Sequence, residues 1–171
     1  MQNQKITKNT SLKKILELGE YCEKCGNCCM HSSGFISKNE IKRLAKHFRI
    51  KEKDFIDKYL EKKKLFNNNV YKFKTMKKPF GPCIFYNKEK GCMIHKIKPL
   101  HCRIGNCNEH GEELSAWFTV NYLVNPTDPE SIRQFKIYID SKGKTLEGGK
   151  LKDLVKDPKL LKKILNYEVL K

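Results

Sequence analysis

Cysteine is the residue type in this chain whose spacing most directly indicates chemistry. The first four cysteines form one string, Cys22-x2-Cys25-x2-Cys28-Cys29. The second four are spread more widely: Cys83, Cys92, Cys102 and Cys107. Thiolates are soft, anionic ligands that close four-ligand zinc sites and hold iron–sulfur clusters. We therefore predict that these eight residues are metal ligands.

An even number of cysteines would also suit disulfides or redox-active thiols. The chain has 171 residues, which is long enough to fold without covalent staples. Its first residues, Met1 to Asn9, are polar and lack the apolar stretch of a secretory signal. We therefore expect a cytoplasmic location, where reducing conditions disfavour disulfides.

The choice of metal depends on the first string. Bacterial ferredoxins place three cysteines at this spacing on one loop, whereas zinc knuckles use two. The spacing favours an iron–sulfur cluster of the 4Fe-4S type, with zinc as the other cofactor. Cys29 departs from the ferredoxin pattern, and adjacent residues rarely aim both side chains at one centre. Cys29 therefore serves a second centre or none, and the number of centres stays open.

Three further side chains accompany the second group. Cys92-x2-His95 has the ligand spacing of a zinc site, although His95 is equally suited to a hydrogen-bonding role beside the metal. His101, next to Cys102, suits such a supporting position or the surface. Arg103 would neutralise a thiolate-rich site or form a surface salt bridge.

The elements that must position these residues include a short N-terminal helix and a helical hairpin. Between Ser11 and Tyr21, the apolar residues Leu12, Ile15, Leu16 and Leu18 predict a short helix that ends at Gly19, its C-cap. Ser37 and Glu40 form a capping-box pattern ahead of an apolar helical face. A second helix is predicted around Phe55 to Leu60, which makes a helical hairpin.

Strand patterns are short. Val70 to Phe73 alternates like a strand, and Ile84 to Ile94 predicts a hairpin around a loop that contains Gly91. Trp117 to Val124 fits a strand or a helix. Phe135, Ile137 and Ile139 predict a strand, and Leu151 to Leu170 is helical, with Asp157-Pro158 starting its last segment.

These elements predict an α+β fold. We expect one small domain over residues 1–171, with a helical hairpin, short strands and cysteine-rich metal-binding loops. Its chelating region would span residues 20–107 and be followed by an α/β extension at 111–171. With 39% apolar and 32% charged residues and no run of 18 apolar residues, the composition is that of a soluble chain without a membrane span.

The net charge is +17, from 36 Lys and Arg against 19 Asp and Glu. Such a charge suits nucleic acid or acidic protein partners. Lysines are spread over the whole chain, however, and aromatic residues are not interleaved with a basic run. Nucleic acid is therefore a partner that the sequence allows but does not favour.

The sequence resembles the YkgJ-type cysteine-cluster proteins, a family described as zinc- or iron-chelating. The residues that carry the resemblance are Cys22, Cys25, Cys28, Cys29, Cys83, Cys92, Pro99, Cys102 and Arg103. The resemblance implies metal chelation, and some relatives are flagellin lysine N-methylases that use S-adenosylmethionine. The family tends to have an aromatic residue and a proline after the Cys-Arg pair, whereas Ile104-Gly105-Asn106-Cys107 follows here.

We therefore predict a metal-binding protein that acts as a redox, metal-handling or accessory module. Its partner would be a larger redox or modifying enzyme, or a protein substrate. One alternative is an S-adenosylmethionine-dependent protein lysine methyltransferase-like enzyme, although no methyl-donor motif follows residue 110. Another is a zinc-stabilised nucleic-acid-binding module. Whether the protein is an enzyme stays open.

Overall fold

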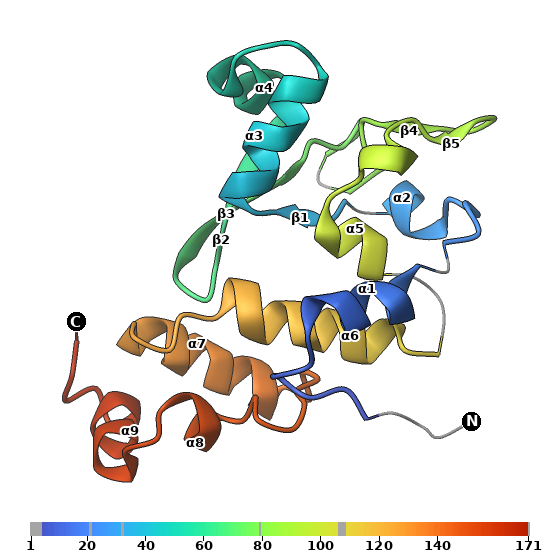
Figure 1. The fold of residues 1–171 in the computed structure, drawn as a ribbon. Helices are drawn as coiled ribbons and strands as arrows, with labels where there is room; N and C mark the ends of the chain where they lie inside the picture. The colour runs from blue at the N-terminus through green and yellow to red at the C-terminus, as the bar shows by residue number, and fades with distance from the viewer. Residues whose placement is uncertain (1–4, 21, 32, 79, 106–108, 171) are drawn as a thin grey trace.

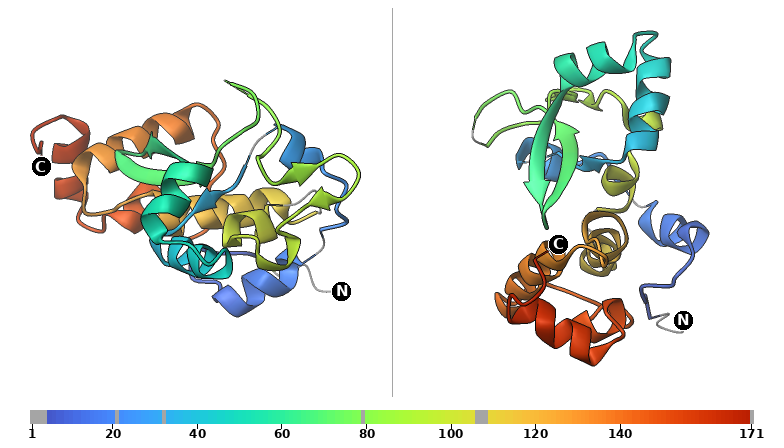
Figure 2. Two further views of the ribbon diagram at one scale, coloured as in Figure 1. Left: turned by 90° about the horizontal axis from the view of Figure 1, so that it is seen from above. Right: turned by 90° about the vertical axis from the view of Figure 1, so that its left-hand side faces the viewer.

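Figure 1 shows the computed structural model, which describes residues 5–20, 22–31, 33–78, 80–105 and 109–170. The chain has an α+β fold, as predicted. A short sheet, a pair of helices and a small hairpin occupy one part of the molecule. The N-terminal helix and the C-terminal helices lie together on the other side, as the views in Figure 2 also show.

Helix α1 (Leu12–Gly19) confirms the first predicted helix. Its N-cap, Ser11, accepts a hydrogen bond from the backbone of Lys14. The helix ends at Gly19 but the cap is Glu20, so the glycine has another purpose. A Cβ at position 19 would lie 2.9 Å from the Cα of Ile104. Gly19 therefore allows α1 to pack closely on helix α5 (Leu100–Ile104).

The predicted helical hairpin is formed by α3 (Lys38–His47) and α4 (Glu52–Tyr59). The carboxylate of Glu40 accepts the backbone N–H of Ser37 at 3.0 Å, as the capping box requires. The apolar face of α3 is buried against Phe55 of α4 and the neighbouring strands. Leu60, predicted as helical, is instead the first residue of a strand.

The main sheet has three antiparallel strands in the order β1-β3-β2. Their bounds are β1 (Phe35–Ile36), β2 (Leu60–Leu65) and β3 (Asn68–Phe73). β2 and β3 form a hairpin whose turn residues, Phe66 and Asn67, both have positive φ. The β2–β3 hairpin was not predicted. The hairpin predicted at Ile84 to Ile94 is present with shorter strands, β4 (Tyr86–Asn87) and β5 (Gly91–Cys92), so Gly91 lies in a strand and not in the loop.

Every named element in the described residues from 111 to 170 is a helix, joined by loops and turns, which corrects the α/β extension predicted there. The undecided segment from Trp117 lies in helix. The helices are α6 (Gly111–Phe118), the π-helical η2 (Thr119–Leu123), α7 (Pro129–Asp140), α8 (Leu151–Leu154) and α9 (Pro158–Leu165).

The strand predicted at Phe135 to Ile139 is part of helix α7. Asp128 caps this helix by accepting the N–H of Glu130, and Pro129 occupies its first turn. Ile132 and Phe135 are fully buried, three positions apart, whereas Ile137 is 61% exposed. The burial therefore follows a helical repeat. The final segment is two helices, and the second begins after Asp157, as predicted.

Three apolar clusters form the core. One lies between α1, α5 and α6, a second under α3, α4 and the cysteine-bearing hairpin, and a third among α7, α8 and α9. The first two clusters flank the loops that carry cysteine, so the site rests on packed elements. Within the described ranges, the chain has no helix with the length and apolar character to span a bilayer.

Candidate metal centre

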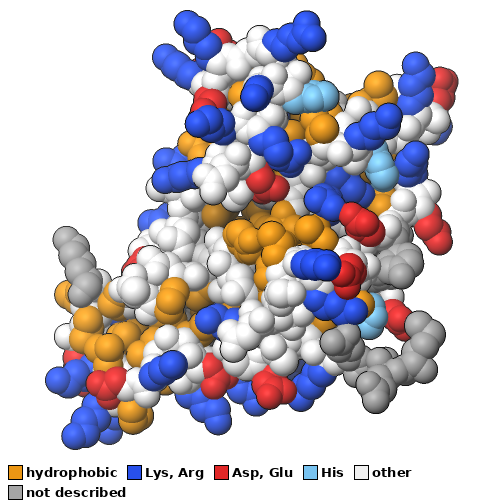
Figure 3. Space-filling model, in the orientation of Figure 1, with side chains coloured by type: hydrophobic (Ala, Val, Ile, Leu, Met, Phe, Trp, Pro, Cys, Tyr) orange, Lys and Arg blue, Asp and Glu red, His pale blue; other side chains and the backbone are white. Residues whose placement is uncertain are grey.

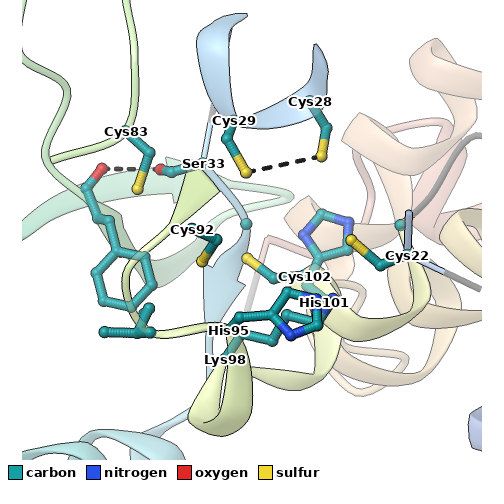
Figure 4. A pocket seen from close by; sticks show the side chains of 14 residues that line it. Cys22, Cys28, Cys29, Ser33, Cys83, Cys92, His95, Lys98, His101 and Cys102 are labelled. Carbon is teal, nitrogen blue, oxygen red and sulfur yellow. Dashed lines mark hydrogen bonds between the residues drawn. The ribbon is translucent and has the colours of Figure 1, made fainter. Parts of the chain in front are cut away.

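Six cysteines from both halves of the pattern line one cavity of about 180 Å³. They are Cys22, Cys28, Cys29, Cys83, Cys92 and Cys102. Figure 4 shows their side chains around this space, together with those of His95, Lys98 and His101. The two cysteine groups, more than 50 residues apart along the chain, thus form a single cluster of thiols.

The short helix α2 (Asn27–His31) carries the adjacent pair Cys28 and Cys29. Both face the cavity, and their sulfurs lie 3.9 Å apart. Two thiolates on one tetrahedral metal ion with bonds of about 2.3 Å would have sulfurs about 3.8 Å apart. The spacing of this adjacent pair therefore suits two ligands of one metal ion.

Backbone hydrogen bonds join the second cysteine group to the first. The N–H of Cys83 donates to the carbonyl of Cys29 at 2.8 Å. The thiol of Cys29 also interacts with that of Cys92 on strand β5. Cys29 therefore lies between Cys28 on its own helix and two cysteines from the distant loops.

Backbone amides point at several sulfurs. The N–H groups of Phe85, Ile94 and Gly34 hydrogen-bond to Cys83, Cys92 and Cys102 respectively, and each lowers the pKa of its thiol. These bonds favour the thiolate, which is the form that binds metal. The approach at Cys102 requires glycine, because a Cβ at position 34 would lie 2.5 Å from its sulfur.

The thiols differ in acidity. The hydrogen bond from Cys29 lowers the pKa of Cys28 to about 6, and the same kind of bond lowers the pKa of Cys92 to about 6. The two bonds raise the pKa of Cys29 itself. Burial raises the pKa of Cys83 to about 11 and also raises the pKa of Cys102. A bound cation would supply the charge that the buried thiolates require.

His101 belongs to the wall of the cavity. Its Nδ1 accepts the backbone N–H of Phe35 at 3.0 Å, and burial lowers its pKa to about 4. The imidazole is therefore neutral. It stacks on Phe35 and Phe118 with ring centroids 5.4 and 4.4 Å away, and Phe118 stacks on Tyr122. His101 was expected either in a supporting position beside the metal or at the surface, and it lies in this column of rings in the cavity wall.

His95 also lines the cavity, and its Nε2 lies 3.5 Å from the Nζ of Lys98. An ammonium only donates, so His95 is the acceptor in this contact. Burial lowers the pKa of His95, and the charges of Lys98 and Lys24 add to that effect. One nitrogen of His95 is thus engaged by lysine.

Arg103 does not line the cavity. Its guanidinium donates to the carboxylate of Glu20 at 2.6 Å, in a partly exposed ion pair. Of the two roles expected for Arg103, the structure therefore shows the surface salt bridge. Cys25 is exposed and is not part of the cavity wall, while Cys107 lies outside the described residues.

In the described ranges, no three His, Cys, Asp or Glu side chains are already arranged to hold a metal ion. The donor set nevertheless fits zinc or iron in type and in number. Six thiols face one space, where four complete a zinc site or a four-iron cluster.

Residues 21–121 match the family model CxxCxxCC, described as "Putative zinc- or iron-chelating domain". The chain belongs to this family. The match covers more than half of the chain and contains the whole cavity wall.

One curated relative is an uncharacterised protein of Methanocaldococcus jannaschii. It is 30% identical over 105 residues, which are 61% of this chain and 52% of the relative. The chain therefore spans about half the length of that relative. No solved structure matches.

Sequence reasoning missed two contributors to the site, Gly34 and Lys98. Gly34 precedes a strand of only two residues, and Lys98 precedes Pro99 in an irregular segment. Neither position has the spacing of a motif. The one available signal for Lys98 was its place directly before Pro99, a residue that carries the family resemblance.

Proposed function

We propose that this protein binds an iron–sulfur cluster through the thiolates of the cavity and acts as a redox, metal-handling or accessory module. The observation that carries the proposal is that six thiols line one cavity. Zinc and a four-iron cluster each use four thiolates, and a redox-inert zinc site has no need of the two spare thiols. The amides directed at Cys83, Cys92 and Cys102 add support, because hydrogen bonds to sulfur tune iron–sulfur clusters.

A four-iron cluster takes one thiolate per iron, so it would use four of the six thiols. The cluster would supply one-electron chemistry when bound. The chain contributes the thiolates, the amides that favour their charged form and the apolar wall formed by residues such as Phe73 and Ile94. This wall limits the access of water to the cavity.

Zinc is the second candidate, and a specific distance favours it. The sulfurs of Cys28 and Cys29, 3.9 Å apart, suit two ligands of one ion, whereas a four-iron cluster assigns each thiolate to its own iron. A zinc centre would be structural, because zinc has no redox chemistry.

An accessory role is supported by apolar side chains that are exposed on the cysteine-bearing segments. Phe80 is 81% exposed, and Met30, Met76 and Met93 are also exposed. Met30 follows Cys29 directly, and Met93 follows Cys92. Exposed methionines are common at surfaces that bind other proteins.

The test is anaerobic purification of the full chain, followed by analysis of iron, acid-labile sulfide and zinc. An iron–sulfur protein is brown, contains iron and sulfide in equal amounts and loses visible absorbance when dithionite reduces it. Stoichiometric zinc without iron would replace the first candidate with the second. A chain that holds neither metal would overturn both.

A further inference from the structure

Lys98 is the buried member of the lysines that the structure describes. Its side chain lines the thiol cavity, and the residue is 9% exposed. Most other Lys and Arg side chains lie at the surface, and many of them are visible on the face drawn in Figure 3. The high net charge of the chain therefore does not explain why this lysine is buried in the cavity wall.

The backbone around Lys98 is held in place. The guanidinium of Arg43 on α3 donates to the carbonyls of Ile97 and Lys98, at 3.0 and 3.4 Å. Pro99, which follows, is fully buried. These contacts fix the end of the short 3₁₀ helix η1 (His95–Ile97), from which the lysine side chain reaches the cavity.

The ammonium has a neutral neighbour. Its Nζ lies 3.5 Å from the Nε2 of His95, and no carboxylate in the described part of the chain forms an ion pair with Lys98. A buried charge without an opposite charge is costly. The groups of opposite charge that the cavity can offer are thiolates, and Lys98 favours the charged forms of Cys28 and Cys92.

A metal–thiolate centre would provide the missing negative charge. Four thiolates around a divalent zinc ion carry a net charge of −2, and an iron–sulfur cluster with four thiolates is also an anion. Coulomb attraction across a cavity with apolar walls is stronger than in water. An ammonium in the wall therefore stabilises the loaded site more than the empty one.

We propose that Lys98 is the charge-compensating residue of the metal centre. This inference rests on the proposed function only in requiring a metal–thiolate centre in the cavity, and it holds for zinc and for iron alike. The sequence suggested Arg103 for this role, but Arg103 pairs with Glu20 outside the cavity. Lys98 thus contributes through its charge and donates no electron pair to the metal.

The test compares Lys98→Met with Lys98→Arg and with Lys96→Met. Methionine keeps the length of the side chain and removes its charge, and arginine keeps the charge. Lys96 lies in the short helix η1, which ends just before Lys98, and it is exposed. Its variant is therefore the matched control. Each protein is loaded with zinc, and its affinity is measured by competition with a chromophoric chelator.

We expect Lys98→Met to bind zinc about 10- to 100-fold more weakly, as is usual when a residue supporting a metal site is lost. Lys98→Arg and Lys96→Met should stay close to the wild type. In iron-loaded protein, Lys98→Met should have a more negative reduction potential, because the reduced cluster carries the larger negative charge. A purely structural lysine would not move the potential in this direction.

Equal affinity and equal potential in Lys98→Met and Lys96→Met would overturn the inference while leaving the proposed function intact. A wild-type chain that takes up no metal would instead remove the proposed function, and the inference with it. Circular dichroism checks the fold of each variant. Lys98→Gln replaces Lys98→Met if the latter does not fold.

Discussion

Gly34 allows the sulfur of Cys102 to approach the backbone so closely that a Cβ at position 34 would lie 2.5 Å from it. The same Cβ would lie 3.1 Å from the backbone nitrogen of Cys102. A side chain at position 34 and the thiol of Cys102 would therefore occupy the same space.

Replacing Gly34 with alanine should displace Cys102 and weaken metal binding. Overpacking of this kind typically costs about 1–3 kcal/mol, and here the strain falls on a cavity thiol. Metal content after purification and affinity by chelator competition would measure the loss. Asn39→Ala, at an exposed position of helix α3, is the control. Full metal content in Gly34→Ala would show that Cys102 is not required.

Cys25 and Cys29 should differ in their effect on the site. Cys29 lines the cavity beside Cys28 and Cys92, whereas Cys25 is exposed and does not. We expect Cys29→Ala to lose most of its bound metal and Cys25→Ala to keep it. Metal analysis of both variants, purified side by side, checks this order. The reverse order would mean that the first loop changes its conformation when metal binds.

Metal removal should loosen the molecule unevenly. The cluster of α7, α8 and α9 contains no cysteine, while the thiols connect α2, the β4–β5 hairpin and α5. After treatment with a chelator, amide hydrogen exchange should therefore speed up around Cys28, Cys92 and Cys102 and stay slow around Phe135. A uniform acceleration over the whole chain would contradict this expectation.

Arg133 should matter for the C-terminal helices and not for the metal. Its buried guanidinium donates to the carbonyls of Ile164 and Val169 at 3.0 and 2.9 Å. Arg133→Met would leave these carbonyls without their donor and should lower the free energy of unfolding by about 2–3 kcal/mol. Urea denaturation measures this loss, and metal content should be unchanged.

The control for that variant is Lys136→Met on the same helix. Lys136 forms an exposed pair with Asp140, and its loss should change stability by less than about 1 kcal/mol. Similar losses in the two variants would show that the buried position of Arg133 gives its hydrogen bonds no special weight.

Local signals in the sequence predicted much of the fold. Ser11, the Ser37–Glu40 pair and Asp157-Pro158 each mark a helix start that the structure has. The strand predicted at Phe135 is wrong because the short alternating run there follows Asp128-Pro129, a helix start signal of the same kind. The alternation was accidental, since burial in this segment follows the helix.

The site was less predictable, because a string of cysteines does not define the direction of each side chain. Helix α2 begins at Asn27, so Cys28 and Cys29 occupy successive helical positions about 100° apart. That start brings Cys29 to the cavity and leaves Cys25 on the exposed loop before it. Gly34 and Lys98 reach the site through tertiary packing, which no local pattern describes.

The hydrogen bond from the N–H of Cys83 to the carbonyl of Cys29 has a consequence for fragments of this chain. Neither cysteine group forms its half of the cavity alone, so a gene fragment encoding one string would give its protein no pocket. A peptide copied from residues 22–29 would be a poor mimic of the intact centre.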